Sequence, residues 1–503
     1  MNRELMIQQL ESVPQWDICI IGGGATGLGT ALDAASRGFK TILFEQHDFA
    51  KGTSSRSTKL VHGGVRYLQQ GNIKLVMEAL RERGLLLKNA PHLVHNQKFV
   101  VPNYKWWEKS FYGIGLKIYD KMAGKLGLGP SELLSKEEIL QLAPTLDTKD
   151  LKGGVLYYDG QFDDARLAIS LTQTAAQKGG VVLNYFPVCG LLKMNSKICG
   201  VWVKDFLTGK EYEVKSKVVI NATGVFTDVI MKMDEPKHEN IISPSQGIHL
   251  VVNKEFLPGE TAIMIPRTDD GRVLFAVPWH NKIVLGTTDT PAGTISAEPV
   301  PLEEEIEFIL THIGRYLSKD PQRGDVKSMF AGLRPLVKGK TRKTAALSRD
   351  HLISLSNSGL ITITGGKWTT YRKMAEDVVD IAIKTFSLPH YTCMTKDLVL
   401  HGHKDHVTPA ATDSLTNDEL ENFVKKSILE EMCCTVEDFL ARRSRQLFLD
   451  AKVALAIAPR VAQLMAEEMD KDESWIKQQI NNFNAIAINY LPTVTIHPGS
   501  VQE

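Results

Sequence analysis

The sequence lacks any long apolar run and carries almost no net charge. No stretch of the 503 residues approaches the ~18 apolar residues that a membrane-spanning helix requires, so any membrane contact should be peripheral. Residues 1–16 show neither the apolar core of a secretory signal nor the arginine- and serine-rich pattern of an organellar transit peptide. The formal charge of +1 argues against a globally basic protein that binds nucleic acid.

Cysteine is scarce as well. The six cysteines include no C-x-x-C pair, a pattern typical of neither a disulfide framework nor a zinc site. We therefore expect no metal and a reducing, cytoplasmic setting. The apolar content of 43% and the charged content of 23% are ordinary for a folded protein, and the length allows two or three domains.

The strongest local pattern lies in residues 17–45, DICIIGGGATGLGTALDAASRGFKTILFE. A short apolar strand over 18–21 leads into G-x-G-x-x-G, an alanine-rich helix follows, and a second strand over 41–44 ends at Glu45. These parts stand in the order that a dinucleotide-binding βαβ unit requires, so the match is more specific than the glycines alone. An α/β turn without a ligand is the alternative.

Each glycine of this motif has a physical task in binding a dinucleotide. Gly22 permits the tight turn, Gly24 lets a pyrophosphate approach the backbone, and Gly27 lets helix and strand pack closely. Glu45 can accept hydrogen bonds from a ribose 2′-hydroxyl and would repel a 2′-phosphate, which disfavours an NADP-type ligand. The motif alone does not distinguish a nicotinamide from a flavin.

A second glycine motif follows a strand near the end of the α/β patterns, in ITITGGKWTTYRKM (361–374). After the β-branched run, Gly365 and Gly366 begin a helical pattern whose first turn carries Lys367. Paired glycines let backbone N–H groups approach a ligand closely, and a helix N-terminus favours negative charge. Lys367 in this position therefore calls for an anionic partner. An ordinary strand-to-helix turn is the alternative.

Residues 52–71, GTSSRSTKLVHGGVRYLQQG, resemble an element of the FAD-dependent glycerol-3-phosphate dehydrogenase family, T-S-S-x-x-S/T-K-L-x-H-G-G-x-R-Y-L. Further landmarks stand in family order between residue 16 and about residue 385: APHLV (90–94), DDARL (163–167), NATG (221–224), GIHLVV (247–252), VPW (277–279), GTTD (286–289), GLRPL (332–336), LSRDH (347–351) and TGGKWTTYRK (364–373). An ordered set of this length is far more specific than any single motif.

The resemblance implies an α/β fold, in which an FAD-binding Rossmann-like domain of the glutathione-reductase type is interleaved with an antiparallel substrate-binding sheet and followed by a C-terminal helical cap. The expected segments are 16–90, 155–240 and 340–388 for the FAD-binding domain, 91–154 and 241–339 for the sheet, and 389–503 for the helical domain. The sequence supports the last boundary independently, because strand patterns give way to charged segments of helical length such as LTNDELENFVKKSILEEM.

The resemblance also implies FAD as the cofactor and nominates residues beside it: Ser54, Ser55, Thr58, Lys59, His62, Gly224, Gly365 and Gly366. It implies a cationic cluster around a phosphorylated substrate: Arg66, Arg334, Arg349 and Lys367. Arginine suits a phosphate dianion because its planar fork binds oxygens in pairs. We expect Arg334 and Lys367 nearest the reacting carbon, with Arg349 on the phosphate. A surface ion pair is the alternative for any one of these arginines.

Oxidising an alcohol also needs a group that accepts the hydroxyl proton. His249 in GIHLVV and His62 in VHGG are the candidates, because histidine titrates near neutrality. The alternative is a structural histidine, hydrogen-bonded in the sheet or lying beside the flavin. Tyr67, next to Arg66, either hydrogen-bonds the substrate or packs.

The activity that the resemblance implies is oxidation of sn-glycerol 3-phosphate to dihydroxyacetone phosphate, with a hydride passing from C2 to flavin N5 and electrons going on to ubiquinone or menaquinone. The related oxidases, which use O₂, carry an insertion for which this length leaves little room, and the calcium loop D-x-D-x-D-G of mitochondrial members does not occur. Both observations favour the bacterial, quinone-linked type. The alternatives are a glycerol-3-phosphate oxidase, a related amine or hydroxy-acid oxidoreductase, and a non-catalytic flavin-binding membrane module.

Residues 103–129 interleave lysines with large apolar side chains, as a helix in a membrane interface does. The apolar members are Trp106, Trp107, Phe111, Tyr112, Ile114, Leu116 and Tyr119. Dehydrogenases of the family are peripheral membrane enzymes, so the resemblance implies the inner face of the cell membrane. An amphipathic helix packed on its own domain is the alternative. The basic stretch ARRSRQ (441–446) predicts a solvated helix face or added basic surface, and a homodimer is left open.

Overall fold

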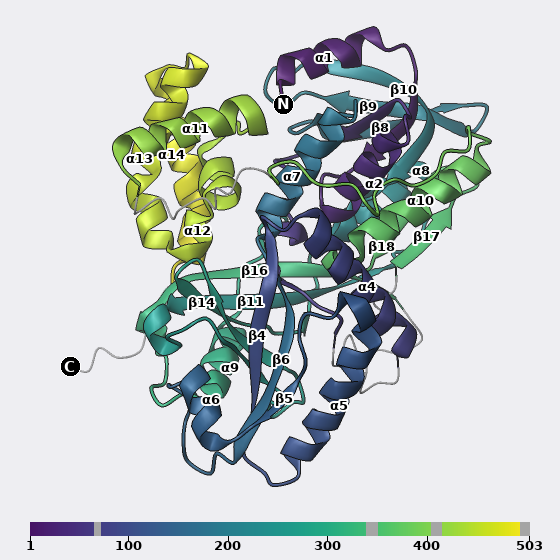
Figure 1. Ribbon diagram of the computed structural model, residues 1–503. Coiled ribbons are helices and arrows are strands. Elements are labelled where there is room, and N and C mark those ends of the chain that lie inside the picture. Colours follow the sequence, from purple (N-terminus) through teal and green to yellow (C-terminus); the bar gives the residue numbers. More distant parts are fainter. Residues whose placement is uncertain (65–71, 339–350, 404–414, 493–503) are drawn as a thin grey trace.

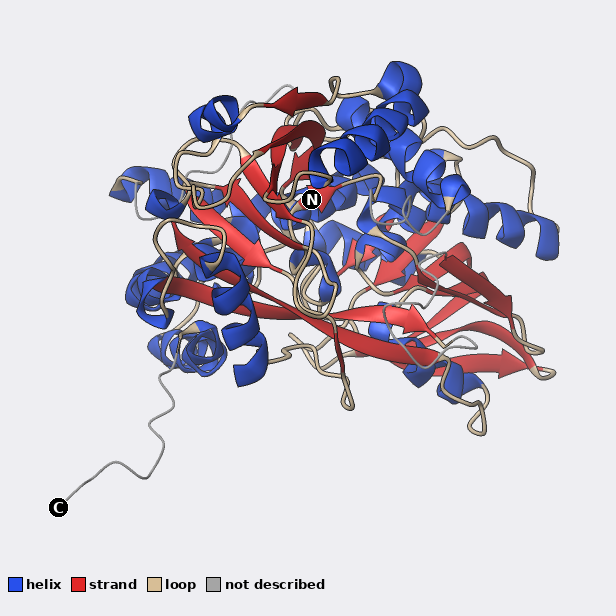
Figure 2. Ribbon diagram, turned by 90° about the horizontal axis from the view of Figure 1, so that it is seen from below, coloured by secondary structure: helices blue, strands red, loops and turns tan. Residues whose placement is uncertain are grey.

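The computed structural model describes residues 1–64, 72–338, 351–403 and 415–492. Figure 1 shows two sheet-containing layers, one above the other, with the C-terminal helices beside the upper layer. Seen from below in Figure 2, the long strands of the lower layer extend across much of the molecule. The chain passes between the two layers several times, as an interleaved fold requires.

The upper layer is a mostly parallel sheet of the dinucleotide-binding kind. Its strands follow the order β17 (His351–Leu355), β18 (Leu360–Gly365), β10 (Glu211–Asn221), β1 (Trp16–Ile21), β2 (Thr41–Phe44) and β7 (Val181–Leu183). The hairpin of β8 (Val188–Met194) and β9 (Lys197–Lys204) extends from β10. The central strands β1 and β2 are almost entirely buried, as expected of a parallel sheet that is covered on both faces.

Helices cover this sheet and enclose the first apolar core. They are α1 (Arg3–Ser12), α2 (Ala25–Ser36), α7 (Asp164–Gln177), α8 (Thr227–Asp234) and α10 (Tyr371–Thr385). The strand predicted over 41–44 is confirmed, and the one predicted over 18–21 begins two residues earlier, at Trp16. The helix predicted after Gly366 begins with a 3-10 turn, Trp368–Thr370, that leads directly into α10.

The lower layer is a ten-stranded, mainly antiparallel sheet. Its strands are β3 (Leu60–Val61), β4 (Val94–Asn103), β5 (Glu132–Leu134), β6 (Gly153–Phe162), β11 (Ile242–Asn253), β12 (Ala262–Ile265), β13 (Leu274–Trp279), β14 (Lys282–Gly286), β15 (Thr290–Pro291) and β16 (Val326–Val337). The flanking helices are α4 (Ile73–Asn89), α5 (Glu108–Ala123), α6 (Lys136–Leu142) and α9 (Glu303–Gly314). Only β12 and β4 pair in parallel among the described strands of this sheet.

One expected segment boundary falls inside a strand. The sequence places residue 155 at the start of a segment of the FAD-binding domain, whereas β6 pairs with β4 along its whole length, from Val94–Phe162 to Asn103–Gly153. The backbone hydrogen bonds of β6 therefore lie in the lower sheet. The chain returns to the upper layer only at α7, whose first residue is Asp164.

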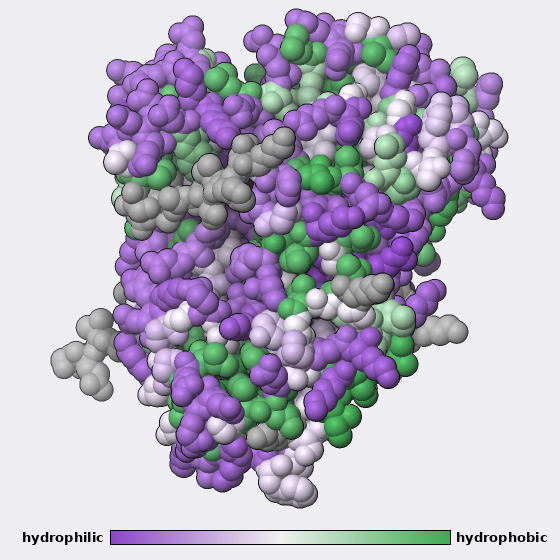
Figure 3. All heavy atoms as spheres, viewed as in Figure 1, coloured by the Kyte–Doolittle hydropathy of each residue, from purple (hydrophilic) through white to green (hydrophobic). Residues whose placement is uncertain are grey.

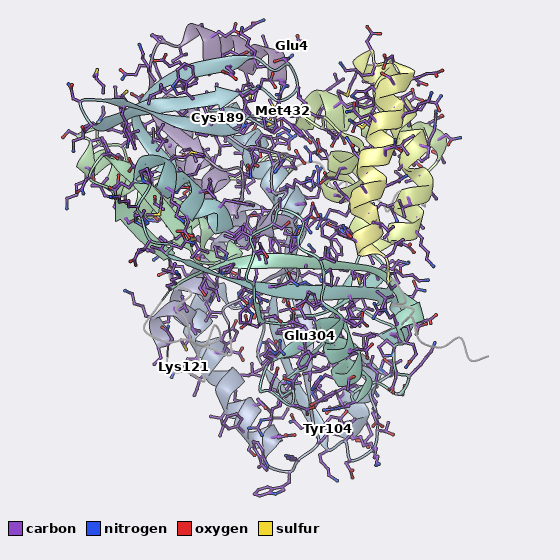
Figure 4. All side chains as sticks on the ribbon, turned by 180° about the vertical axis from the view of Figure 1, so that it is seen from behind. Glu4, Tyr104, Lys121, Cys189, Glu304 and Met432 are labelled. Carbon is purple, nitrogen blue, oxygen red and sulfur yellow. The ribbon has the colours of Figure 1, made fainter. Side chains whose placement is uncertain are left out.

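The C-terminal region is helical, as predicted. It contains α11 (Asn417–Glu431), a π-helical turn (Asp438–Arg443), α12 (Gln446–Leu449), α13 (Ala451–Met469) and α14 (Glu473–Ala487). Its apolar core includes Trp279 and Phe330 from the lower sheet, so the helices are packed on β13 and β16. Met432, at the end of α11, lies at the junction with the upper layer in Figure 4, where its carbonyl accepts a hydrogen bond from Asn184.

The expectation of a solvated basic face over 441–446 is wrong. The side chains of Arg442, Arg443 and Arg445 are buried, because each guanidinium pairs with a carboxylate of the upper layer. Asp48 binds the first two of these arginines, and Asp164 binds the third. Among the helices that the structure describes, none combines the length and apolarity needed to cross a bilayer.

Candidate active site

Two adjoining cavities lie between the upper sheet and the lower sheet. The first cavity is lined by the turn after β1, the end of β2 and the residues around the start of α8. The second cavity is lined by residues from segment 53–62 and from strands β11, β13 and β16. Six residues belong to both walls and so join the two spaces: Thr53, Pro335, Gly365, Gly366, Lys367 and Trp368.

The turn after β1 needs its glycines. Gly22 has a φ of +109°, and a Cβ there would lie 2.8 Å from the carbonyl oxygen of Ala222 on the neighbouring strand end. A Cβ on Gly27 would lie 1.8 Å from the carbonyl oxygen of Gly22. Gly27 therefore sits where α2 packs against the turn and does not itself line the cavity.

The N-terminus of α2 borders the first cavity. Its N-cap residue, Gly24, has no side chain to occupy the space, and a Cβ there would lie 3.1 Å from Ser54 Oγ. The next N–H, that of Ala25, donates to Ser54 Oγ at 2.9 Å. A glycine turn that leads into a helix N-terminus suits a phosphate group, because the N–H groups and the helix dipole both favour an anion.

Glu45 lies beside this helix terminus at the end of β2. Its Oε2 accepts the Gly23 N–H at 2.6 Å and its Oε1 accepts the His47 N–H at 2.9 Å. Burial raises the pKa of Glu45, and the two backbone hydrogen bonds act in the opposite direction. Each carboxylate oxygen has a further lone pair for a ligand hydroxyl.

The remainder of the first cavity is largely apolar. Its wall includes Phe44, Phe186, Val188, Val229 and Met233. Gly224, at a φ of +59°, lines the same space. An apolar ring site, a carboxylate beside the helix terminus and a glycine turn together fit the adenine, ribose and pyrophosphate of a dinucleotide.

The paired glycines at the end of β18 form the shared wall of the two cavities. Gly365 and Gly366 have φ values of +80° and +70°, both in the left-handed region that favours glycine. A Cβ on Gly366 would lie 2.3 Å from Met374 Sδ. Lys367 follows in an extended conformation and borders both spaces. Trp368 Nε1 donates to the Ser54 carbonyl oxygen at 2.8 Å, which ties this wall to segment 53–62.

His249 comes from the middle of β11 and is almost fully buried, with 2% of its surface exposed. Its ring stacks on Phe330 with centroids 4.9 Å apart, and its Nε2 lies 2.9 Å from Thr58 Oγ1. Nδ1 is buried without a hydrogen-bond partner in the described part of the chain. Burial lowers the pKa of His249 well below its usual range, and the positive charges of Lys59 and Arg334 lower it further. The imidazole is therefore neutral at pH 7.

Arg334, on β16, is held by the loop that follows β14. Its Nη2 donates to the Thr288 carbonyl oxygen at 2.8 Å and to Thr287 Oγ1 at 3.1 Å, and its Nη1 lies 3.5 Å from Asp289 Oδ1. A Cβ on Gly247 would lie 2.2 Å from Nη2, so the guanidinium needs glycine at that position of β11. These contacts fix a cation in the wall of the second cavity.

The sequence analysis did not identify the residues that hold Arg334 as site residues. Gly247, Thr287 and Asp289 lie in GIHLVV and GTTD, two landmarks that the sequence offers without a role for each side chain. The loop also needs Glu305 of α9, which accepts hydrogen bonds from Thr288 Oγ1 at 2.7 Å and from Gln246 Nε2 at 2.8 Å. No short motif marks Glu305, because only the fold brings α9 to this loop.

The predicted cofactor residues of segment 53–62 separate into three groups. Ser54 lines the first cavity, and Thr58 and His62 line the second. Ser55 and Lys59 line neither, which differs from the sequence expectation. The Lys59 ammonium is fully buried, where it donates to Asp164 at 2.7 Å and to the Ser55 carbonyl oxygen at 2.8 Å. Burial lowers the pKa of Lys59 to about 7, against the opposing effect of Asp164.

Three predicted substrate residues, Arg66, Tyr67 and Arg349, lie outside the described residues. Of the predicted catalytic residues, His249, Arg334 and Lys367 come together in the wall of the second cavity from β11, β16 and the end of β18. Two cations and a neutral histidine beside a dinucleotide cavity can bind an anion and accept a proton next to it.

Comparison with known proteins gives matches over almost the whole chain. A family model described as FAD dependent oxidoreductase matches residues 17–372, and a model of the C-terminal domain of alpha-glycerophosphate oxidase matches residues 395–475. The mitochondrial glycerol-3-phosphate dehydrogenase of Mesocricetus auratus is 42% identical over 532 residues, covering 94% of this chain and 73% of the relative.

Two solved structures have the same fold. The glycerol-3-phosphate dehydrogenase of Bacillus halodurans, complexed with FAD, superposes with a TM-score of 0.80 at 29% identity, covering 98% of this chain and 99% of the other. The L-alpha-glycerophosphate oxidase of Mycoplasma pneumoniae, with FAD bound, superposes with a TM-score of 0.60 at 18% identity. The match covers 76% of this chain and 97% of the oxidase chain. The second likeness concerns the fold alone.

Proposed function

Because the chain belongs to the FAD-dependent glycerol-3-phosphate dehydrogenase family, we propose that it oxidises sn-glycerol 3-phosphate at C2 to dihydroxyacetone phosphate and passes the electrons to a membrane quinone. FAD is the cofactor of this family of proteins. The observation that carries the proposal is the second cavity, where Arg334, Lys367 and His249 meet beside the dinucleotide cavity.

The first cavity supplies the contacts for FAD. The α2 N-terminus at Gly24 and the Glu45 carboxylate would hold its pyrophosphate and ribose, and Gly365 and Gly366 would bring backbone N–H groups to its ring. When bound, FAD supplies the acceptor for the hydride that leaves C2. The paired glycines keep the shared wall thin, so a substrate in the second cavity lies next to the flavin ring.

The cations of the second cavity bind and orient the substrate. Thr287 and Thr288 hold Arg334 in place, and its fixed positive charge in the cavity wall attracts the phosphate or the C2 oxygen. Lys367 adds a second positive charge from the shared wall. Two cations favour a phosphorylated alcohol and repel a protonated amine, which argues against amine oxidation by the same fold. Arg66, Tyr67 and Arg349 remain predicted contributors to this binding.

His249 is the proposed proton acceptor. Its pKa is lowered by burial and by Lys59 and Arg334, so the neutral imidazole is available at pH 7. Nε2 lies 2.9 Å from Thr58 Oγ1 in the cavity wall, so the Thr58 hydroxyl passes its own proton to Nε2 as it accepts the hydroxyl proton of C2, and the same contact holds the ring in place. Stacking on Phe330 prevents the ring from turning away.

A membrane surface is the proposed route to the quinone. On α5, Tyr112, Leu116 and Tyr119 pack inward, as in the helix-on-its-own-domain alternative. The opposite side of α5 exposes Phe111 (53%), Ile114 (64%) and Ile118 (48%), and Trp106 (86%), just before the helix, is exposed as well. Figure 3 shows hydrophobic side chains gathered at the lower right, where α5 lies in Figure 1. Lys121 extends from the same helix in Figure 4. This face suits the inner surface of the cell membrane.

The proposed reaction is tested by the visible spectrum of the purified holoprotein under anaerobic conditions, with sn-glycerol 3-phosphate added. We expect the oxidised-flavin band to bleach and to return on addition of a ubiquinone analogue. A band that stays unchanged with this substrate would remove the reaction while keeping the cofactor. Return of the band with O₂ as fast as with quinone would identify an oxidase.

Replacing Arg334 with methionine should lower turnover on the order of 100-fold or more, because the developing charge at the C2 oxygen and the phosphate lose a fixed donor. Bound FAD should remain, since Arg334 lines only the second cavity. Steady-state kinetics and the flavin content of the purified variant measure the two effects. Arg315→Met, an exposed arginine paired with Asp269, is the control and should keep both values. Unchanged turnover in Arg334→Met would remove the residue from the active site.

Replacing Ile114 with glutamate should weaken binding to vesicles that contain anionic lipid on the order of ten- to 100-fold, because a buried apolar side chain contributes roughly 1.5–3 kcal/mol. Co-sedimentation with the vesicles measures it. Leu429→Glu, a similarly exposed aliphatic residue on α11, is the control and should bind as the wild type does. Equal binding by wild type and Ile114→Glu would place the membrane contact elsewhere.

A further inference from the structure

Arg445 belongs to the C-terminal helical region, yet its side chain ends beside the active-site segment. It precedes α12 with a φ of +64°, and 1% of its surface is exposed. Its Nη2 donates to Asp164 Oδ1 at 2.9 Å and to the Ser55 carbonyl oxygen at 3.1 Å. Its guanidinium carbon lies 4.4 Å from the centroid of the Phe448 ring, which fixes the direction of the side chain.

Asp164 transmits this contact to the residues around Thr58. Its Oδ2 accepts the Ser57 N–H at 3.0 Å, the Ser57 hydroxyl at 2.7 Å and the Lys59 ammonium at 2.7 Å. The backbone between Ser55 and Lys59 is therefore held on both sides of Thr58. Asp164 is the first residue of α7, so a helix of the upper layer fixes the position of its carboxylate.

Segment 53–59 presents its other side to the active site. Thr58 Oγ1 pairs with His249 Nε2, Thr53 borders both cavities, and Thr53 Oγ1 donates to the Leu333 carbonyl oxygen at 2.5 Å. Leu333 is the neighbour of Arg334 on β16. A displacement of this segment would therefore move Thr58, the partner of His249. It would also move Thr53, which lies in the wall shared by the two cavities.

We propose that Arg445 is a positioning residue, through which the C-terminal helical region fixes segment 53–59, and with it Thr58, against His249. The proposal rests on the proposed function of the second cavity. It gives the C-terminal region a part in catalysis, although Arg445 itself lines neither cavity and touches no reacting group.

Other ion pairs cross the same junction without reaching this segment. Arg166, on α7 two residues after Asp164, donates to both carboxylate oxygens of Glu431 at 2.7 Å. It shares a helix with Asp164 and joins the same two parts of the molecule as Arg445 does. If the junction only held the fold together, loss of either arginine would have the same kind of effect.

The test compares the holoproteins of wild type, Arg445→Met, Arg445→Lys and the matched control Arg166→Met. Amide hydrogen exchange followed by mass spectrometry should show faster exchange of peptides over 53–59 in Arg445→Met and little change there in Arg166→Met. Anaerobic stopped-flow reduction of the flavin by sn-glycerol 3-phosphate should slow on the order of ten- to 100-fold in Arg445→Met, because a small misplacement of catalytic groups is costly. Arg445→Lys should recover part of the rate, since an ammonium replaces one of the two hydrogen bonds.

Equal exchange over 53–59 in Arg445→Met and wild type would overturn the proposal, as would equal slowing in Arg166→Met. If Arg445→Met does not fold, Arg445→Gln, which also removes the charge that pairs with Asp164, decides in the same two measurements, and a wild-type rate with wild-type exchange in that variant would refute the positioning role. If sn-glycerol 3-phosphate fails to reduce the wild-type flavin, the proposed function fails, and hydrogen exchange still tests the contact between Arg445 and segment 53–59.

Discussion

A histidine that is kept neutral beside two cations is the constraint on which the rest of the active site depends. His249 lies between Phe330 and Thr58, out of contact with bulk water, and Lys59 and Arg334 add positive charge nearby. Arg334, in the wall of the cavity proposed for the phosphorylated substrate, therefore also disfavours protonation of the histidine, as does the buried Lys59. Burial is the larger of these causes, and the ring is buried because it comes from the middle of a central strand.

This arrangement needs all three parts of the molecule. The upper layer supplies the glycine turn, Glu45 and the paired glycines that border both cavities. The lower sheet supplies His249 and Arg334, and the loop after β14 fixes the guanidinium. The C-terminal helices pack on the back of the lower sheet and reach Asp164 through Arg445. Buried charges at this junction are paired in each case, because an unpaired charge there would be strongly destabilising.

The sequence was sufficient for the fold and for most of the cavity wall, and insufficient for the contacts between domains. The βαβ unit could be predicted because Gly22, Gly27 and Glu45 are required by local geometry, and the paired glycines at the end of β18 by their positive φ. Lys59 was assigned to the cofactor because its motif says nothing of Asp164, 105 residues away in sequence. The arginines of 441–446 were predicted to lie on a solvated face for the same reason. Their partners come from distant segments, so no periodicity or short motif reveals that they are buried.

The most direct test of the account is the pH dependence of anaerobic flavin reduction by sn-glycerol 3-phosphate. Because the pKa of His249 lies below its ordinary value of 6.5, the rate constant should stay on its plateau as the pH falls through 6.5 and decline only at lower pH. Lys59→Met removes one of the cations that lower this pKa, so the acid limb should move to higher pH in that variant. An acid limb at or above pH 6.5 in the wild type, unmoved by Lys59→Met, would contradict a neutral His249 as the proton acceptor.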